Sequence, residues 1–288
     1  MTTQDSFDSV RFEVSKELTK DSTLDQLRAE LQPYARRYLD GEPGCFVLTG
    51  LQHLDLAQSQ AFALAASSAL GDLLPQDSAG TLLREVRDRG MKLGEGATGR
   101  YSDSRTGGNL HTDSPHRPGS VPDYFTLTCI HQAAVGGDLV LVRLPGLLER
   151  LGEHAGVLET LRRPVHFDTR DDTPGAPRTT LRPVLEARHG KDHVHYLREY
   201  IEIGHRRPGI APLTDAQVRA FDLLDGLLDS PELWSRGRLR EGEMIFIDNR
   251  WTLHGRVEFQ DLQGDHQRLM LRTWIGAVHP QLAGSLTS

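Results

Sequence analysis

The stretch GGNLHTDSPHRPG, residues 107–119, gathers the side chains of this sequence that are best suited to chemistry. It places His111 and Asp113 two residues apart in a run rich in glycine and proline. In an extended segment, the side chains at positions i and i+2 point to the same side. The imidazole and the carboxylate would then project together and hold a metal ion from one short piece of backbone. The alternative is a turn in which Asp113 only caps its own backbone.

The best candidate for a third ligand is His254, which lies much later in the chain, in FIDNRWTLHGR. Two histidines and one carboxylate on one face of an octahedron leave three coordination positions open. Non-haem iron oxygenases use this arrangement, because a cosubstrate and O2 must both reach the metal. A metal-dependent hydrolase could use the same three ligands with a bound water.

Two arginines follow in QRLMLRTW, with Arg268 fourteen residues and Arg272 eighteen residues after His254. They share one face of a predicted strand and would lie about 13 Å apart at roughly 3.3 Å per residue. A guanidinium group can donate two parallel hydrogen bonds to a carboxylate, so the two arginines could hold two different anionic groups. In the alternative orientation, Leu269 and Leu271 face the core and the arginines form surface salt bridges.

A rival metal site lies in HVHYLRE. His193, His195 and Glu199 match the His-x-His-x3-Glu spacing of cupins, which are also β-barrels. The cupin motif also needs glycines at defined distances, and Gly190 and Gly204 do not stand there. We therefore interpret the two histidines as residues of an ordinary strand.

Strand-like runs crowd together in the second half of the chain, bounded by turn residues. They are DYFTLTCI, GDLVLVRL, RPVHFDT, TLRPVLEA, HVHYLREYIEI, EMIFID, RWTLHGRVEF and QRLMLRTWIG. Earlier strands are predicted in GCFVLTGL and TLLREVR, and helices over residues 24–39, 55–74, 145–161 (broken near 152–156) and 214–228. The pattern predicts a mainly β protein with flanking helices. A jelly-roll barrel fits better than a parallel sheet, because strands and helices do not alternate regularly.

The formal net charge of −7 over 288 residues argues against a nucleic-acid or anionic-membrane partner. No run approaches the roughly 20 apolar residues of a membrane helix, and the N-terminus lacks the pattern of a signal peptide. We therefore expect a cytoplasmic protein, and its oligomeric state stays open. Cys45 and Cys129 lie in apolar runs and are predicted to be buried free thiols.

Four motifs together resemble the Fe(II)- and 2-oxoglutarate-dependent oxygenases of the taurine dioxygenase and clavaminate synthase-like superfamily. They are HTD at 111–113, GGD at 136–138, DNRWTLHGR at 248–256 and RLMLR at 268–272. The resemblance spans roughly residues 47–276. It implies a double-stranded β-helix (jelly-roll) core in a single oxygenase domain of residues 1–288, with a lead-in of about 1–90 and a core of about 91–280. It also implies iron, 2-oxoglutarate as cosubstrate, and O2.

Carried over by position, the resemblance implies that His111, Asp113 and His254 bind iron. Arg268 would hold the distal carboxylate of 2-oxoglutarate, and Arg272 would face the substrate.

The pattern departs from the family at Leu139, where a Thr or Ser hydroxyl usually contacts 2-oxoglutarate. We expect that hydroxyl to come from Thr126 or Thr128, or the contact to be absent.

Three residues flank the metal-binding pair and are candidates for substrate contact: Asn109, Ser114 and His116. For His116, an exposed loop position is an equal alternative. We also expect Asp248 and Arg256 to form a structural ion pair.

The implied activity is hydroxylation, desaturation or cyclisation at an unactivated C–H bond of a small acidic or amino-acid-like substrate in secondary metabolism. Succinate and CO2 would be released. The alternatives are a non-redox, metal-binding cupin-like module and a sulfonate-catabolic dioxygenase of the same superfamily. Residues 90–108, rich in glycine, are predicted to form a lid over the site, with residues 168–180 as the alternative lid.

Overall fold

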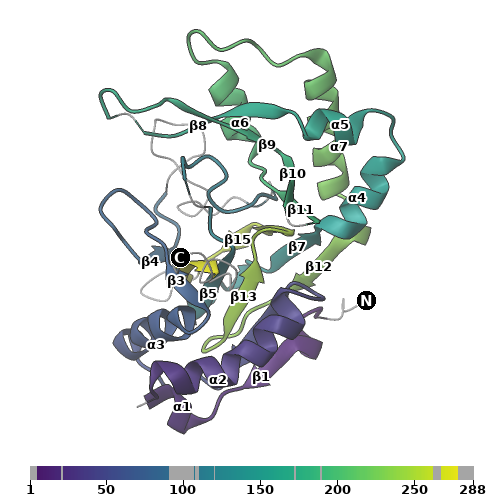
Figure 1. Cartoon of the computed structure of the whole chain (residues 1–288). Helices are drawn as coiled ribbons and strands as arrows, with labels where there is room; N and C mark the ends of the chain where they lie inside the picture. Colours follow the sequence, from purple (N-terminus) through teal and green to yellow (C-terminus); the bar gives the residue numbers. More distant parts are fainter. Residues whose placement is uncertain are drawn as a thin grey trace, which may run out of the picture.

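The computed structural model describes residues 5–20, 22–90, 107, 110–119, 121–171, 173–188, 190–261 and 267–277. The predicted lid at 90–108 lies outside these residues except for Gly90 and Gly107, and Asn109 lies outside them as well. In the described part, strands dominate and helices flank them, as the sequence predicts (Figure 1). No helix there is both long enough and apolar enough to cross a membrane.

The larger sheet runs in the order β1-β2-β13-β5-β16-β3, and β4 also pairs with β16. Its strands are β1 (Arg11–Glu13), β2 (Cys45–Thr49), β3 (Gly71–Leu73), β4 (Leu83–Val86), β5 (Tyr124–His131), β13 (Met244–Asp248) and β16 (Leu269–Ala277). The central strands β13, β5 and β16 pair antiparallel. Because side chains alternate along a strand, Phe125 and Leu127 of β5 face one side of the sheet, whereas Thr126 and Thr128 face the other.

The smaller sheet contains β12 (Trp234–Gly237), β7 (Leu139–Arg143) and β14 (Thr252–Arg256), with β7 in the middle. Its Leu141 joins Phe125 and Ile245 of the larger sheet in one buried apolar cluster, so the two sheets face each other. Burial of each such side chain stabilises the fold by roughly 1.5–3 kcal/mol. His254 lies in β14 opposite Leu141 of β7, so this sheet carries one of the predicted ligands.

The outer face of the larger sheet is covered by the N-terminal helices. These are α1 (Lys16–Lys20), α2 (Leu24–Tyr34) with a π-helical turn at Ala35–Leu39, and α3 (Leu56–Ser68). Thr23 caps α2 and Asp55 caps α3, each through a reciprocal capping box with a glutamine. Leu31 and Phe62 from these helices pack against Phe46 of β2.

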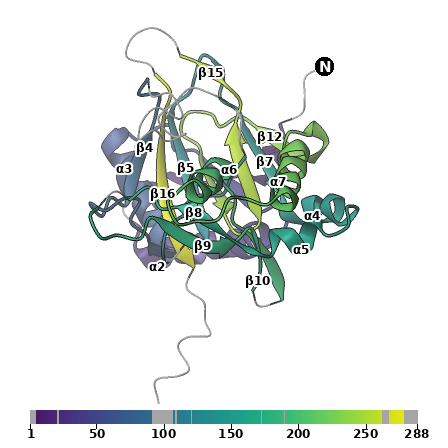
Figure 2. The same cartoon turned by 90° about the horizontal axis from the view of Figure 1, so that it is seen from above.

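A second group of elements lies at the opposite end of the molecule (Figure 1). Its helices are α4 (Leu144–Gly152), α5 (Val157–Leu161), α6 (Arg198–His205) and α7 (Asp215–Leu228). Its strands are β8 (Pro164–Asp168), β9 (Thr179–Pro183), β10 (Leu185–Arg188) and β11 (Lys191–Val194), in two antiparallel pairs. Seen from this end in Figure 2, β8, β9 and α6 lie across the middle of the view, between β16 and β7. Short elements complete the order: 3-10 turns at Asp8–Val10 and Pro231–Leu233, β6 (Val135–Gly136) and β15 (Phe259–Gln260).

Two expectations for these elements were wrong, and one strand was not foreseen. HVHYLREYIEI is not one strand, because α6 begins at Arg198 and buries Tyr200, Ile201 and Gly204 at helical spacing. Gly204 fits there because it lies against the backbone of β8, where a Cβ would clash. The helix predicted over 55–74 ends at Ser68 and gives way to β3, and β12 was not foreseen.

Candidate metal centre and active site

The HTD triplet is not a loose loop, because its backbone is held by three other segments. The N–H of His111 donates to the carbonyl of His254 at 3.0 Å, and the N–H of His254 donates back at 2.8 Å. The N–H of Thr112 donates to the carbonyl of Tyr196, and the Thr112 hydroxyl accepts from the N–H of Tyr196 at 3.0 Å. The first ligand residue therefore comes paired with the last one.

Asn249 fixes the backbone of Asp113. Its side-chain oxygen accepts from the N–H of Asp113 at 2.7 Å, and its amide donates to the carbonyls of Asp113 and Pro122 at 3.0 and 2.8 Å. Asn249 is 1% exposed, so these buried backbone groups have no water to replace it. The turn between β13 and β14 thus positions the carboxylate of a residue far earlier in the chain.

The side chains of His111, Asp113 and His254 converge. One ligand atom from each lies within 4.8 Å of the others, and no other group of His, Cys, Asp and Glu does so among the described residues. The two imidazole rings are 4.6 Å apart, and Nε2 of His254 is 4.0 Å from Oδ1 of Asp113. The ring of Phe125 packs at 4.2 Å from that of His254. Two imidazoles and one carboxylate are the donor set that suits Fe(II) with open positions.

The carboxylate of Asp113 is oriented by two donors from β16. Arg272 donates from Nη1 to Oδ1 at 3.0 Å, and Trp274 donates from Nε1 to Oδ2 at 2.7 Å. Gln76 in turn accepts from Nε of Arg272 at 2.9 Å and donates to its carbonyl at 2.7 Å. Each carboxylate oxygen keeps a second lone pair for a metal, and such outer contacts orient metal ligands in general.

The charge states of Asp113 and His254 also favour binding of a cation. Burial alone would raise the pKa of Asp113, but Arg272 and the two histidines outweigh burial and hold that pKa below its usual value. Burial, followed by the neighbouring His111, lowers the pKa of His254 to about 3. Asp113 is therefore ionised and His254 neutral near pH 7, which are the forms that bind a metal.

Arg268 is a buried cation whose donors are not all used. It is 2% exposed, and its Nε has no hydrogen-bond partner among the described residues. Its guanidinium lies 5.2 Å from the centre of the Phe259 ring. Burial, followed by repulsion from Arg256, lowers the pKa of Arg268 to about 10. An anion placed here would gain a charge-assisted partner, so the site fits the carboxylate of a cosubstrate.

The alternative in which Arg268 and Arg272 face solvent is wrong, because both side chains are buried. Leu271 instead pairs with Thr128 on the outer face of the sheet.

The two threonines do not reach this centre. The hydroxyl of Thr126 lies 2.6 Å from that of Thr273, which in turn lies 2.6 Å from Ser67 of α3. Thr128 is paired with Met244, a residue of the cluster under the N-terminal helices. Both hydroxyls therefore point away from the face of β5 on which Phe125 packs against His254 of the smaller sheet.

A cavity of about 390 Å³ opens above the metal-binding groups. Three segments besides the HTD triplet line it: the loop 114–118, the β3–β4 connection with Gln76, and the β8–β9 connection with Thr169, Arg170, Asp171 and Pro177. Arg272, Trp274, Leu197 and Tyr200 complete its lining. The volume lies in the range of small-molecule sites.

Two of the substrate candidates line this cavity. Ser114 is 5% exposed, its φ is +61°, and its hydroxyl has no hydrogen-bond partner among the described residues. His116 packs edge-on against Tyr200 at 4.8 Å and is half-buried. Arg272 also lines the cavity, but the donors described above are directed at Asp113 and Gln76.

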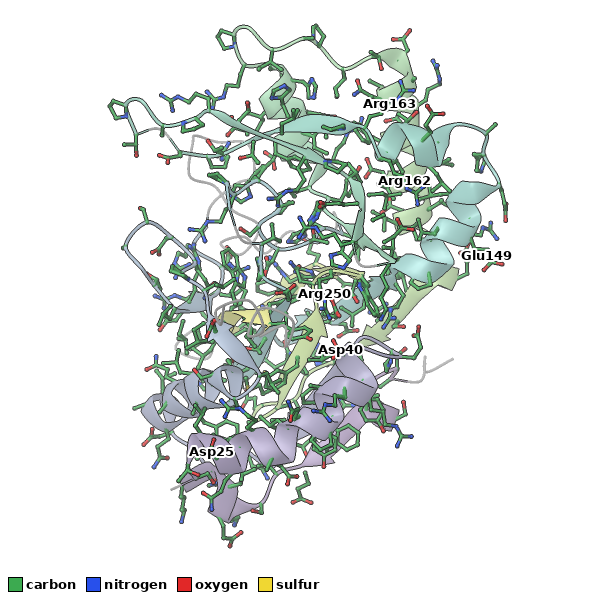
Figure 3. The ribbon with its side chains drawn as sticks, viewed as in Figure 1. Asp25, Asp40, Glu149, Arg162, Arg163 and Arg250 are labelled. Atoms are coloured by element: carbon green, nitrogen blue, oxygen red, sulfur yellow. The ribbon has the colours of Figure 1, made fainter. Side chains whose placement is uncertain are left out.

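The expected pair of Asp248 and Arg256 is wrong. Asp248 forms an ion pair with Arg250 at 2.6 Å. Arg250 also forms an ion pair with Asp40 at 2.8 Å, and Figure 3 labels Arg250 and Asp40. Arg256 instead lies 5.3 Å from the centre of the Phe259 ring.

The rival cupin-like set does not form a metal site. His193, His195 and Glu199 do not meet among the described residues, and Nε2 of His195 lies 3.2 Å from Glu186. His193 lies in β11, whereas Glu199 belongs to α6.

Sequence reasoning missed several residues of the centre. Asn249 stands inside the motif DNRWTLHGR, so the signal for it was present. Trp274 follows Arg272 at the i+2 spacing that places it on the same face. Gln76 and Arg170 come from distant connections, and nothing in their local sequence marks them.

Comparisons with known proteins show the family of this chain. The model of the family described as "Taurine catabolism dioxygenase TauD, TfdA family" matches residues 12–274. FR-33289 synthase of Streptomyces rubellomurinus is 26% identical over 240 residues, covering 81% of this chain and 68% of that protein.

Two solved structures share the fold. Asparagine oxygenase in complex with Fe(II), 3-hydroxyasparagine and succinate has a TM-score of 0.71 and 19% identity, covering 92% of this chain and 93% of its own. The non-haem iron oxygenase OrfP in complex with Fe and α-ketoglutaric acid has a TM-score of 0.64 and 16% identity, covering 93% and 94%. Since the family model spans most of the sequence, the chain belongs to the TauD/TfdA dioxygenase family and is a non-haem iron, 2-oxoglutarate-dependent oxygenase.

Proposed function

We propose that the chain hydroxylates an unactivated C–H bond of a small acidic or amino-acid-like substrate in secondary metabolism, releasing succinate and CO2. The observation that carries this proposal is the convergence of His111, Asp113 and His254 beside a polar cavity of about 390 Å³, which His111 and Asp113 line. The asparagine oxygenase that shares the fold acts on an amino acid, which supports the substrate class. Desaturation or cyclisation would use the same residues.

His111, Asp113 and His254 would hold iron, which together with 2-oxoglutarate and O2 supplies the oxidising power. Arg272 and Trp274 would keep the Asp113 carboxylate in place through their hydrogen bonds. Ser114 would donate or accept a hydrogen bond at the substrate, because its buried hydroxyl has no partner among the described residues.

Arg268 would bind the distal carboxylate of 2-oxoglutarate through its unused donors. We infer that the additional hydroxyl contact of the family is absent here. Leu139 has no hydroxyl, and Thr126 and Thr128 face the N-terminal helices.

We infer further that the two facing sheets are the double-stranded β-helix of one oxygenase domain. Residues up to about 90 would form the lead-in, and residues of about 91–280 the core. The shared apolar cluster between the sheets and the two related solved folds support this assignment.

The proposal is tested under anaerobic conditions. Purified protein given Fe(II) and 2-oxoglutarate should turn lilac through metal-to-ligand charge transfer, whereas protein given Fe(II) and succinate should stay colourless. Aerobic succinate release should then rise with one class of small substrates. A colourless iron-loaded protein with 2-oxoglutarate would refute the proposed activity.

A further inference from the structure

The imidazole of His254 lacks the kind of hydrogen bonds that orient the Asp113 carboxylate. Its Nδ1 is buried and has no hydrogen-bond partner among the described residues. Its Nε2 lies 4.0 Å from Oδ1 of Asp113, which is beyond hydrogen-bond distance. The histidines of metal sites usually donate their outer N–H to a carboxylate, a carbonyl or a water. In the described part of this chain, a contact of another kind therefore has to fix the ring of His254.

The backbone of His254 is fixed, but it does not determine the angle of the ring. Its N–H and carbonyl pair with His111, and in β14 the residue lies opposite Leu141 of β7. Rotation of an imidazole about χ2 has no sharp staggered minima, so a broad range of ring angles stays open. A metal ligand needs one of these angles, and a neighbouring side chain has to select it.

The ring of Phe125 lies where it can make this selection. Its centre is 4.2 Å from the centre of the His254 ring, and the two planes are inclined by 37°. The rings of His254 and His111 lie farther apart, at 4.6 Å. Phe125 is fully buried, so its ring packs against the imidazole inside the core and not in solvent.

Phe125 is itself held on both sides. It lies in β5, opposite Ile247 of β13 and Trp274 of β16. All three side chains belong to the buried cluster between the two sheets. Close packing of this kind leaves a buried ring little room to move. Phe125 therefore brings a rigid surface from the larger sheet to a ligand that belongs to the smaller sheet.

The same pair of strands also supports the carboxylate ligand. Phe125 and Trp274 lie directly opposite each other on antiparallel strands, so their side chains share one face of the sheet. Trp274 donates a hydrogen bond to Asp113 at 2.7 Å, whereas Phe125 packs against His254. One cross-strand pair thus contacts two of the three proposed metal ligands, one through a hydrogen bond and the other through ring packing.

We propose that Phe125 is a positioning residue of the metal centre, which holds the imidazole of His254 at the angle for binding iron through ring packing. The inference rests on the proposed ligand set of His111, Asp113 and His254. Loss of the Phe125 ring should therefore lower iron affinity by more than the accompanying loss of stability explains.

The test needs variants without the ring and a matched control. Phe125→Leu removes the ring, and Phe125→Met replaces it with a flexible side chain that fills irregular gaps. Phe246 offers the control, because it is also fully buried in the same sheet and its ring stacks on Phe46 at 4.7 Å. It lies opposite Thr126 and belongs to the cluster under the N-terminal helices. Phe246→Leu and Phe246→Met should therefore destabilise the fold similarly without a contact to a metal ligand.

Iron affinity is measured anaerobically by competition with a chelator. 2-Oxoglutarate is left out, so that a contact with the cosubstrate cannot contribute. We expect the affinity to fall about 10-fold or more in the two Phe125 variants, as for other groups that orient metal ligands, and to stay within about twofold of wild type in the two Phe246 variants. Urea unfolding of the metal-free proteins should show similar losses of stability in both pairs.

A spectroscopic measurement separates the orientation of the ligand from the stability of the fold. At saturating iron, near-infrared magnetic circular dichroism reports the ligand field of Fe(II). We expect the ligand-field bands to shift or broaden in the Phe125 variants and to match those of the wild type in the Phe246 variants.

Three results would overturn the inference: wild-type iron affinity in a folded Phe125 variant, ligand-field bands unchanged by loss of the Phe125 ring, or equal losses of iron affinity in the Phe125 and Phe246 variants. None of them would touch the proposed function, which fails only if the wild-type protein with Fe(II) and 2-oxoglutarate stays colourless.

Discussion

The base and the wall of the active-site cavity are built differently. The base means the lining residues His111, Thr112 and Asp113 and the third metal-binding residue, His254. There, the backbones of His111, Thr112 and His254 are hydrogen-bonded to the backbone of distant segments, and the backbone of Asp113 is held by the buried side chain of Asn249. In the wall, meaning loop 114–118 and the β8–β9 connection, side chains such as Arg182 hold the segments together. Backbone pairing fixes ligand positions regardless of many side-chain changes, whereas side-chain contacts change with sequence. The difference suits a constant metal centre below a substrate site that can vary.

The largest effect in this comparison is expected when a metal ligand is removed from the base. His111→Ala, Asp113→Ala and His254→Ala should each lose iron and all turnover while they keep the fold, because their backbone bonds remain. Iron content by metal analysis and far-UV circular dichroism measure the two effects. Stoichiometric iron and activity in any one variant would remove that residue from the ligand set.

The next effect concerns the buried cation behind the base. Arg268→Ala should raise the KM for 2-oxoglutarate by roughly two decades, because a buried carboxylate would lose its charged partner. Arg268→Lys should rescue only partly, since an ammonium group cannot reproduce the planar fork. Steady-state succinate formation is the measurement, and an unchanged KM would point to Arg256 or Arg272 instead.

Asn249→Ala sharpens the comparison, because it removes a backbone clamp but no ligand. It leaves buried groups of Asp113 and Pro122 unpaired, which should lower the free energy of unfolding by about 1–3 kcal/mol. Iron affinity should fall about 10-fold or more, as for other outer contacts of metal sites. Asn249→Asp keeps the acceptor for the N–H of Asp113, so its iron affinity should lie between those of the wild type and Asn249→Ala. Iron affinity equal to wild type in Asn249→Ala would show that the clamp is dispensable.

Gln76→Ala tests a side-chain contact on the same carboxylate. Arg272 would lose its Nε partner but keep Asp113, so we expect a smaller loss of iron affinity, about 3- to 10-fold. The matched control is Gln52→Ala at an exposed position, which should leave iron affinity unchanged. A larger loss for Gln76→Ala than for Asn249→Ala would show that the side-chain contact on the carboxylate matters more than the clamp on the Asp113 backbone.

The smallest effect is expected outside both regions. His193→Ala should keep wild-type iron content and charge-transfer intensity, because His193 does not join the metal-binding group. Loss of iron in this variant alone would restore the cupin-like interpretation.

The sequence could predict what lies on one strand or within one motif. Local spacing or a motif accounts for three features. Arg268 and Arg272 share one face of a strand, Thr23 and Asp55 cap helices, and HTD meets His254. The orientation of β5 was not predictable, because alternation alone does not say which of its two faces packs against the N-terminal helices. Tertiary contact with β8 likewise decided that α6 is a helix, although its sequence also reads as a strand.

The bond between Asp113 and Asn249 joins residues 136 positions apart along the chain. During synthesis, an N-terminal fragment that already contains HTD lacks both this clamp and His254. It can offer iron only two mobile ligands and would bind it weakly. Folding of the sheets, rather than binding of the metal, offsets the entropic cost of closing so long a loop. Iron should therefore enter a completed chain, and a ribosome-bound fragment ending before β13 should not retain it.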